Sequence, residues 1–318
     1  MKPAAASGAG GLAVALGACA DERAEVFVRP AGGPAPAGCR IIGTLTGPRR
    51  GRDTTLPVTA RLQPVADGRT ARAILTEPAY WTPDLPNLYR LEARLESGAD
   101  PATATDRLVG LRRFGVRGRS LWLDGHRWVP RAVAVSGRDD LAACKAAAVA
   151  AVVSEPDELL LARADEIGVA VLAVVSSTKA SDPAAVVAML AAWTAHPAAV
   201  VAILPAGLPP DVVATIATAS RPDRDTLLVA ATVAGAEPPP ASLSPGIDVL
   251  VVALEPGGTP DPAWRDGAAL PLLAWRREPT TPAAGRRPCD ALQATLAAWG
   301  IAAGRDHVPW DWAGYVVA

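Results

Sequence analysis

Residues 196–207 read HPAAVVAILPAG, and the apolar run inside this stretch decides the fold. A strand whose residues are apolar on both faces is buried on both faces, which is typical of a parallel sheet covered by helices. Seven further runs of this kind follow residue 126: RWVPRAVAV, AVAAVVS, GVAVLAVVS, DTLLVAATV, GIDVLVVAL, ALPLLAWR and DWAGYVV. Eight such strands predict a compact (β/α)₈ TIM barrel over residues 119–318, with short loops.

Helical patterns separate most of these strands. They are DDLAACKAAA, EPDELLLARADEIG, DPAAVVAMLAAWTAH, PPDVVATIATAS and RRPCDALQATLAAWG, with a short DPAWRDG. The fifth connection, AGAEPPPASLSPG at residues 234–246, is too rich in proline for a helix. An open, doubly wound sheet is the alternative architecture, but no strand is followed by the glycine-rich phosphate-binding turn of that fold.

The first part of the chain has a different rhythm. From about residue 21 to 118, short segments such as AEVFVRP and LYRLEARLES alternate apolar and polar residues between turns. This pattern predicts an immunoglobulin-like antiparallel β-sandwich. The charge supports a boundary near Gly118, because residues 1–118 carry 16 Lys and Arg against 11 Asp and Glu, whereas residues 119–318 carry 15 against 21.

Residues 1–20, MKPAAASGAGGLAVALGACA, allow two interpretations. Lys2, a run of small apolar residues and the sequence LGAC resemble a lipoprotein export signal in which Cys19 is lipidated. The alternative is the first strand of the sandwich. The first interpretation implies an exported or lipid-anchored protein, and the second leaves a cytoplasmic one.

The composition narrows the class of function. A net charge of −1 over 318 residues gives no electrostatic reason to expect binding to nucleic acid. No apolar run is long enough for a transmembrane helix. The four cysteines and three histidines are scattered, without Cys-x-x-Cys spacing, so neither a metal site nor a cofactor is predicted.

Residues 77–135, which join the two parts, contain a distinctive order of motifs. They run Trp81, Pro83, Pro86, Leu88-Tyr89, then Phe114-Gly115-Val116-Arg117, then Leu123-Asp124-Gly125, then Arg131. The order resembles the junction between the immunoglobulin-like sandwich and the first barrel strand of glycoside hydrolase family 2, which includes β-galactosidases, β-glucuronidases and β-mannosidases. The resemblance implies the fold described above and a carbohydrate ligand. The Asp124-Gly125 pair itself predicts a hairpin turn.

Two later stretches resemble the same family but lack its catalytic residues. ADEIG at 164–168 resembles the family's Cys-Asp-Glu-x-Gly, and HPAAVVAILPAG resembles H-P-S-V-x-x-W-S-x-G-N-E. His196-Pro197 agrees with that motif, whereas its asparagine and acid/base glutamate fall on Ala206 and Gly207. In LPLLAWRREP the family's nucleophilic glutamate falls on Arg276. Retaining hydrolysis needs two carboxyl groups about 5–5.5 Å apart, so the resemblance implies an inactive homologue, a pseudoenzyme that binds carbohydrate or a protein partner.

Relocated carboxylates give a first alternative, an active O-glycosyl hydrolase. Glu155, Glu255 and Glu278 each come just after a predicted strand, at the end where barrel enzymes place their sites. A plainer role is open to each: Glu155 can favour the start of a helix that Ser154 caps, and the other two precede prolines in loops. A second alternative is a structural or interaction module, which predicts a filled barrel mouth without a cavity.

Tryptophans and an arginine are the candidates for binding carbohydrate. We expect Trp275, Trp310 and Trp312 to line the barrel mouth with flat apolar faces, beside Arg276. Packing is the alternative for the tryptophans, and a salt bridge to Glu278 or Asp311 is the alternative for Arg276.

Histidine and serine are not expected to form a hydrolase site. His196 precedes its strand, so capping or packing at the bottom of the barrel is expected. Ser136, Ser154 and Ser176 end strands, but no histidine follows a strand to activate them.

Overall fold

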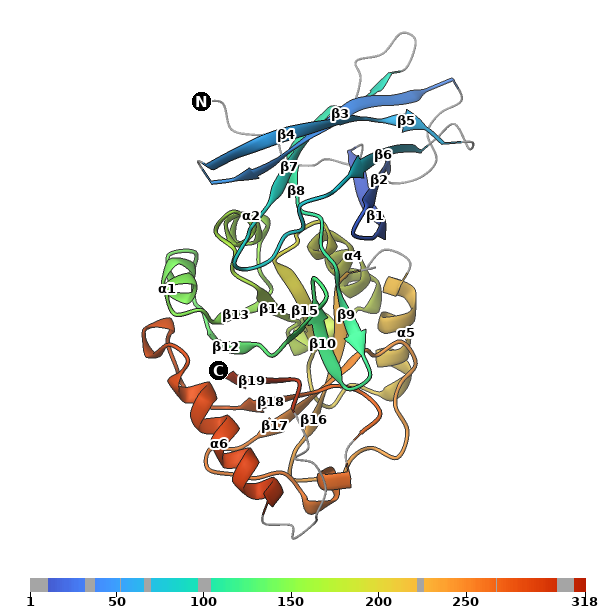
Figure 1. Cartoon of the computed structure of the whole chain (residues 1–318). Helices are drawn as coiled ribbons and strands as arrows, with labels where there is room; N and C mark the ends of the chain where they lie inside the picture. Colours follow the sequence, from blue (N-terminus) through green and yellow to red (C-terminus); the bar gives the residue numbers. More distant parts are fainter. Residues whose placement is uncertain are drawn as a thin grey trace. The chain divides into compact units, whose positions relative to one another are not determined.

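The computed structural model describes residues 11–31, 38–51, 53–65, 70–96, 104–221, 226–266, 268–301 and 312–318. The chain divides into two compact units, one comprising residues 1–81 and 85–112, the other residues 82–84 and 113–318. The first unit is a β-sandwich and the second contains a closed parallel barrel (Figure 1). This is the fold class that the sequence predicts.

Two antiparallel four-stranded sheets make up the sandwich. One has the order β1-β2-β6-β5 and the other β4-β3-β7-β8. The strands are β1 (Leu12–Cys19), β2 (Arg23–Pro30), β3 (Arg40–Arg50), β4 (Asp53–Arg61), β5 (Gln63–Pro64), β6 (Ala71–Thr76), β7 (Leu88–Glu96) and β8 (Ala104–Val109). Strand β1 pairs with β2, so residues 12–19 form a strand of the sandwich, while residues 1–10 lie outside the described part.

Two aromatic residues of the junction motif, Trp81 and Tyr89, are buried in the sandwich unit. Trp81 is fully buried, pairs with Pro86 and donates its backbone N–H to the carbonyl of Leu111 at 2.6 Å. The hydroxyl of Tyr89 accepts the backbone N–H of Ala79 at 2.8 Å. The motif therefore serves packing here, as its residue types predict.

A small three-stranded sheet precedes the barrel: β9 (Phe114–Arg117), β10 (Ser120–Leu123) and β11 (His126–Trp128). Asp124 and Gly125 connect β10 to β11 with φ angles of 48° and 78°. Two consecutive left-handed residues are typical of a type I′ hairpin turn, so the predicted turn is confirmed. Phe114 and Leu121 pack into the same hydrophobic cluster as the barrel interior.

The barrel consists of eight parallel strands in sequence order, and β19 pairs with β12 to close it. They are β12 (Arg131–Ala134), β13 (Ala150–Ser154), β14 (Val171–Val174), β15 (Ala199–Leu204), β16 (Leu228–Ala234), β17 (Val249–Leu254), β18 (Leu272–Arg276) and β19 (Gly314–Val317). All eight predicted strands are present.

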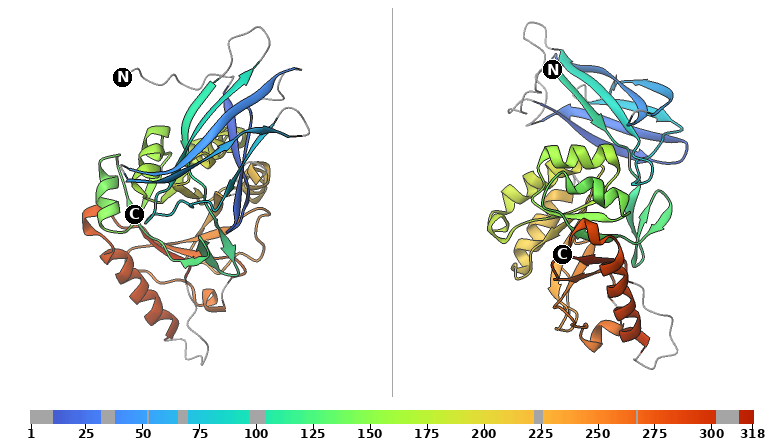
Figure 2. Two further views of the ribbon diagram at one scale, coloured as in Figure 1. Left: turned by 45° about the horizontal axis from the view of Figure 1, so that its top comes forward. Right: turned by 90° about the vertical axis from the view of Figure 1, so that its left-hand side faces the viewer.

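Helices surround the barrel (Figure 2). They are α1 (Asp140–Ala146), α2 (Glu158–Ile167), α3 (Ser177–Ala180), α4 (Pro183–Thr194), α5 (Pro210–Ser220), α6 (Arg287–Ile301), and the 3₁₀ turns η2 (Pro262–Asp266) and η3 (Pro282–Ala284). Residues 235–248, between β16 and β17, form turns and loops and no helix, as the prolines predict.

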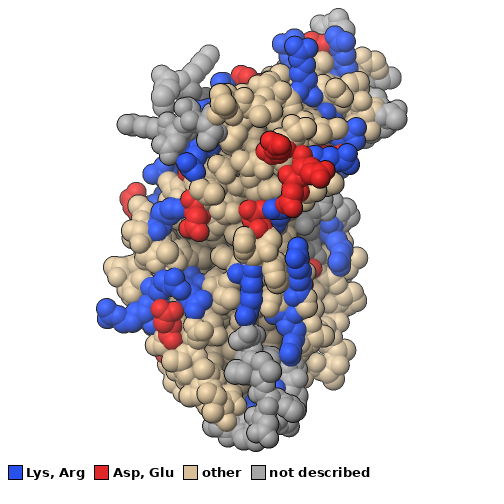
Figure 3. Space-filling view, viewed as in Figure 1, with Lys and Arg blue, Asp and Glu red and all other residues tan. Residues whose placement is uncertain are grey.

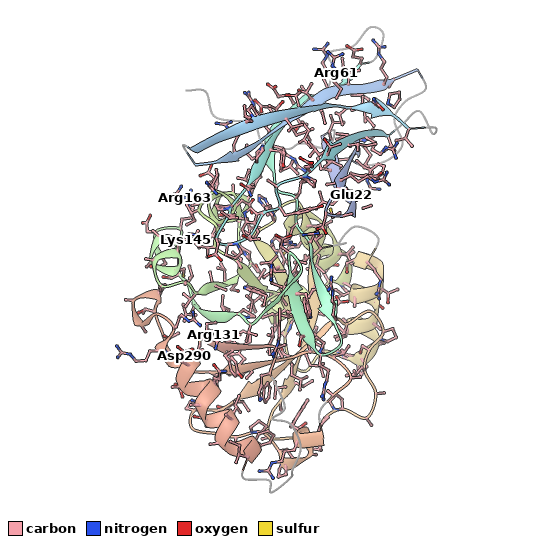
Figure 4. The ribbon with its side chains drawn as sticks, in the orientation of Figure 1. Glu22, Arg61, Arg131, Lys145, Arg163 and Asp290 are labelled. Carbon is pink, nitrogen blue, oxygen red and sulfur yellow. The ribbon has the colours of Figure 1, made fainter. Side chains whose placement is uncertain are left out.

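Arg131 attaches the first barrel strand to the last helix. Its Nε lies 3.2 Å from the carboxylate of Asp290 on α6, and its guanidinium also bonds Gln293 (Figure 4). The guanidinium lies 5.4 Å from the ring centroid of Tyr315 on β19. This arginine of the junction motif thus stabilises the closure of the barrel.

Charged side chains of both signs occur on the face of the molecule drawn in Figure 3. Within the described ranges, no helix is long and apolar enough to cross a membrane. The same residues contain no group of three or more His, Cys, Asp or Glu placed to hold a metal ion.

Candidate functional site

The candidate site is the mouth of the barrel, at the carboxyl ends of its strands. Side chains alternate between the two faces of a strand, and Val152, Leu172, Ile203, Val251 and Leu273 fill the interior. Residues two positions further along have the same orientation and line the mouth: Ser154, Val174, Pro205, Ala253 and Trp275. By the same alternation Thr232, two residues after the interior Ala230, belongs to this ring.

Trp275 provides the aromatic surface at the mouth. It packs against the barrel cluster, is partly exposed, and donates its Nε1–H to the carbonyl of Ala318 at 3.0 Å. This hydrogen bond fixes the indole plane and satisfies its polar group, so the ring face is left for apolar contact. The structure thus places one of the three candidate tryptophans at the mouth.

Arg276 lies on the opposite face of β18. Only 8% of its surface is exposed, and its side chain points away from the interior because its neighbour Trp275 points toward it. The Nε atom lies 3.7 Å from the carboxylate of Glu278, which matches the predicted salt bridge, and Nε and Nη2 are buried without a hydrogen-bond partner. At this register, a side chain at position 276 does not enter the mouth.

The turn after β15 carries no reactive group. Strand β15 ends at Leu204, and Pro205, Ala206 and Gly207 follow. Gly207 has a φ of 78°, and a Cβ added to it would meet no atom within 4 Å. The position that the resemblance gives to an acid/base glutamate is therefore an open, glycine-dependent turn.

Glu155 is the candidate carboxylate with the best-defined position. It follows β13 with a φ of 45°, an uncommon conformation for a residue other than glycine, and its carboxylate accepts a hydrogen bond from the Ser176 hydroxyl. The helix cap expected of Ser154 is instead Asp157, whose side chain accepts the N–H of Leu160 at 2.7 Å. The cap could not be assigned from sequence because several polar residues precede α2.

The other two candidate carboxylates are less confined. Glu255 is exposed in a turn closed by its own carbonyl, which accepts the N–H of Gly258 at 2.9 Å. Glu278 is paired with Arg276. Glu155 follows β13 and Glu255 follows β17, and these two strands lie opposite each other in the barrel, where the backbones of an eight-stranded barrel are roughly 15 Å apart.

Serine hydroxyls at the mouth bond to carboxylates. Ser136 donates both its backbone N–H, at 3.1 Å, and its hydroxyl, at 2.9 Å, to Asp140. These bonds, the backbone one first, hold the pKa of Asp140 below its ordinary value. Asp140 was not predicted as part of the mouth, although its position four residues after Ser136 was a signal for such a bond.

Of the two remaining candidate tryptophans, the structure describes only Trp312, and it does not lie at the mouth. Trp312 precedes β19, at the amino-terminal end of the barrel, and only 2% of its surface is exposed. Its neighbour Ala313 donates its N–H to Leu272, the first residue of β18. The expectation that Trp312 lines the mouth is corrected by this placement, and Trp310 lies outside the described residues.

His196 and Asp165 form a pair at the amino-terminal end of β15. The Nδ1 atom of His196 lies 2.7 Å from the carboxylate of Asp165, which also accepts the N–H of Ala198 at 2.8 Å. Asp165 is 6% exposed. Hydrogen bonds therefore join two stretches that resemble the family, ADEIG in α2 and His196-Pro197 before β15. His196 has a packing role at the bottom of the barrel, as the sequence predicts.

A cavity of about 400 Å³ lies beside the mouth. Its wall includes Gly207, Thr232 and the outer face of β16 at Ala231 and Val233, and it reaches α5. The loop between β16 and β17 contributes Pro240, Ser242, Leu243, Ser244 and Pro245 to its wall.

Solved structures share this fold. The chain is similar to β-D-glucuronidase from Dictyoglomus thermophilum (TM-score 0.63, 14% identity, 96% of this chain and 61% of that one). It is also similar to a β-glucuronidase from Bacteroides uniformis (TM-score 0.63, 14% identity, 96% of this chain and 45% of that one). A β-glucuronidase from Parabacteroides merdae is similar as well (TM-score 0.62, 12% identity, 96% of this chain and 46% of that one). No protein-family model and no curated sequence matches the chain.

These comparisons establish the architecture. The sandwich and barrel have the fold of glycoside hydrolase family 2 enzymes, which is what the junction motifs imply. The chain spans about half of the length of the solved structures that it resembles.

Proposed function

We propose that this chain is a glycoside hydrolase family 2-type protein that binds carbohydrate at its barrel mouth and does not cleave it. The observation that carries the proposal is the turn at Gly207, which holds no acid or base where the resemblance places one. The inward-facing residue at the end of β18 is Trp275, which cannot act as a nucleophile. Its indole face can stack on a sugar ring.

The test combines turnover with binding. The purified chain is incubated with aryl β- and α-glycosides, and binding of the same sugars is measured by calorimetry. We expect no turnover, and we expect Trp275→Ala to weaken binding at least tenfold, about 1.4 kcal/mol. Arg276→Met is the matched control, because it changes the adjacent residue on the other face of β18 and should leave binding unchanged.

The position of Glu155 is a reason to test the alternative of an active hydrolase with relocated carboxylates. Glu155 combines a left-handed backbone with a hydrogen-bonded carboxylate at the mouth, and such strained residues occur at functional sites. Turnover that disappears in Glu155→Ala, with Glu255→Ala and Glu278→Ala measured beside it, would establish relocated catalysis and refute our proposal. A folded protein without turnover or sugar binding would instead favour a structural or protein-binding module.

A further inference from the structure

The sandwich has one edge strand that lacks the usual protection against pairing with another chain. Its two sheets end in four edge strands, β1, β5, β4 and β8. Edge strands are commonly protected by short length, by proline or by charged side chains. Strand β5 has two residues, β4 contains Pro57, and β8 contains Asp106 and Arg107. Strand β1 has eight residues, LAVALGAC, and none of them is charged or proline.

The pairing of β1 with β2 determines which backbone groups of β1 point to the free edge. In an antiparallel pair, every second residue forms hydrogen bonds with the partner strand. The carbonyl of Gly11 accepts the N–H of Ala31 at 2.7 Å, so the bonded positions of the register are Gly11, Ala13 and Ala15. Pro30, which has no N–H, accordingly lies opposite Leu12, at a position that needs no bond. The backbone groups that point to the free edge are those of Leu12, Val14 and Leu16, and no strand of the described ranges pairs with them.

The side chains of these three residues face the core of the sandwich. Leu12 is buried, whereas Val14 and Leu16 pack against the core cluster and remain partly exposed. Because side chains alternate along a strand, Ala13 and Ala15 lie on the outer face of the sheet. The edge of β1 therefore combines free hydrogen-bonding groups with aliphatic side chains that its own sheet covers incompletely.

The free positions of β1 are complementary to a second copy of the same strand. The register shifts between Leu16 and Cys19, a bulge that limits a regular ladder to residues 12–16. These residues are symmetric about Val14. An antiparallel copy brings Leu12 opposite Leu16 of the second copy, and Val14 opposite its own equivalent. Each such pair exchanges two hydrogen bonds, so every free donor in the ladder meets an acceptor.

We propose that β1 pairs antiparallel with β1 of a second copy of this chain, about a two-fold axis at Val14. The pairing joins two β1-β2-β6-β5 sheets into one continuous sheet, a mode of association that uses main-chain hydrogen bonds. The opposed aliphatic side chains stabilise the ladder. No charged side chain of β1 opposes the approach of an identical strand. Two-fold symmetric dimers are also the commonest homo-oligomers.

Sedimentation equilibrium of the purified chain, from micromolar to near-millimolar concentration, tests the association. We expect the average mass to rise from that of one chain toward that of two. In the two-fold ladder Ala13 lies opposite Ala15 of the second copy, so the combination of Ala13→Lys with Ala15→Lys places like charges in direct opposition. This variant should associate at least tenfold more weakly. Its side chains lie on the outer face, so it should fold, which its thermal unfolding checks.

Ile74→Lys is the matched control. Ile74 is 38% exposed between the buried Ala73 and Leu75, so it lies on the outer face of the same sheet. Its strand β6 lies between β2 and β5 and is not an edge. A lysine at this position should therefore leave the association unchanged.

Hydrogen exchange identifies the pairing edge. The amides of Val14 and Leu16 should exchange more slowly as the concentration rises, whereas those of Ala13 and Ala15, which bond β2, should be protected at every concentration. A chain that stays monomeric over the whole range would overturn the proposal. A dimer that survives the two lysines, or that leaves the exchange of Val14 and Leu16 unchanged, would also overturn it, because its interface would lie elsewhere.

Discussion

Gly168 allows a quantitative test of the motif that ends α2. This glycine caps the helix with a φ of 74° and donates its N–H to Ala164 O at 2.9 Å. A Cβ at this position would overlap the carbonyl oxygen of Pro83 and lie 3.2 Å from Lys145 Nζ, which itself bonds that carbonyl. Both Pro83 and Lys145 belong to the same compact unit as Gly168.

Two effects add in Gly168→Ala. The left-handed conformation costs an alanine roughly 1–2 kcal/mol, and displacement of the packed Pro83 carbonyl adds about 1–3 kcal/mol. Gly257→Ala is the matched control, because Gly257 has a φ of 68° but no atom within 4 Å of an added Cβ. We therefore expect the free energy of unfolding to fall about 1–3 kcal/mol further in Gly168→Ala than in Gly257→Ala.

Thermal unfolding of the two variants measures this difference. For a unit of about 200 residues, 1 kcal/mol corresponds to a shift in Tm of roughly 2–4 °C. Gly168→Ala should therefore melt several degrees below Gly257→Ala. Equal losses of stability in both variants would refute the reasoning, since they would show that the contact with Pro83 contributes nothing beyond the backbone conformation.

Two further predictions concern protonation. The bonds from Ser136 lower the pKa of Asp140 below 3.8, so its carboxylate stabilises the folded state above that value and the contribution disappears as the pH falls through the folded pKa. In a plot of the midpoint of urea unfolding against pH, Asp140→Asn should make the decrease at acid pH less steep. An unchanged decrease would contradict the assignment. Burial raises the pKa of Cys144 and Cys289 to about 11, so stability is lost as the pH rises from 9 toward 11. At pH 9 iodoacetamide should label both thiols far more slowly in the folded than in the urea-unfolded chain, which mass spectrometry of the peptides measures; equal rates would contradict their burial.

The architecture was predictable because its signals are local. Eight continuous apolar runs specified eight parallel strands, and the prolines of residues 235–248 excluded a helix there. The Asp124-Gly125 pair specified a hairpin turn, because both residues tolerate positive φ. Each of these features depends on residues that are adjacent in sequence.

The site was less predictable because it depends on side-chain direction. A motif comparison placed the nucleophile position on Arg276, but a shift of one residue along a strand moves a side chain to the other face. The structure directs Trp275 inward and Arg276 outward. The bond between Ser176 and Glu155 joins residues that follow two different strands, and no local pattern in the sequence specifies it.

The residues that match the family pattern and those that depart from it lie in different parts of the barrel. Asp165 and His196 bond at its amino-terminal end, and Gly168 packs beside Pro83. In TIM barrels the amino-terminal end contributes stability, whereas the carboxyl ends of the strands carry catalysis. The residues that match the family pattern therefore belong to the part of the barrel that contributes stability.

The backbone of the turn at Gly207 also disfavours a glutamate. Gly207 has a φ of 78°, a conformation that costs a non-glycine residue roughly 1–2 kcal/mol. Replacing this glycine by glutamate would therefore add strain as well as a carboxylate, although the space beside it is open. The turn that follows β15 therefore suits glycine, and both its backbone and its side chain differ from what a glutamate at this position would require.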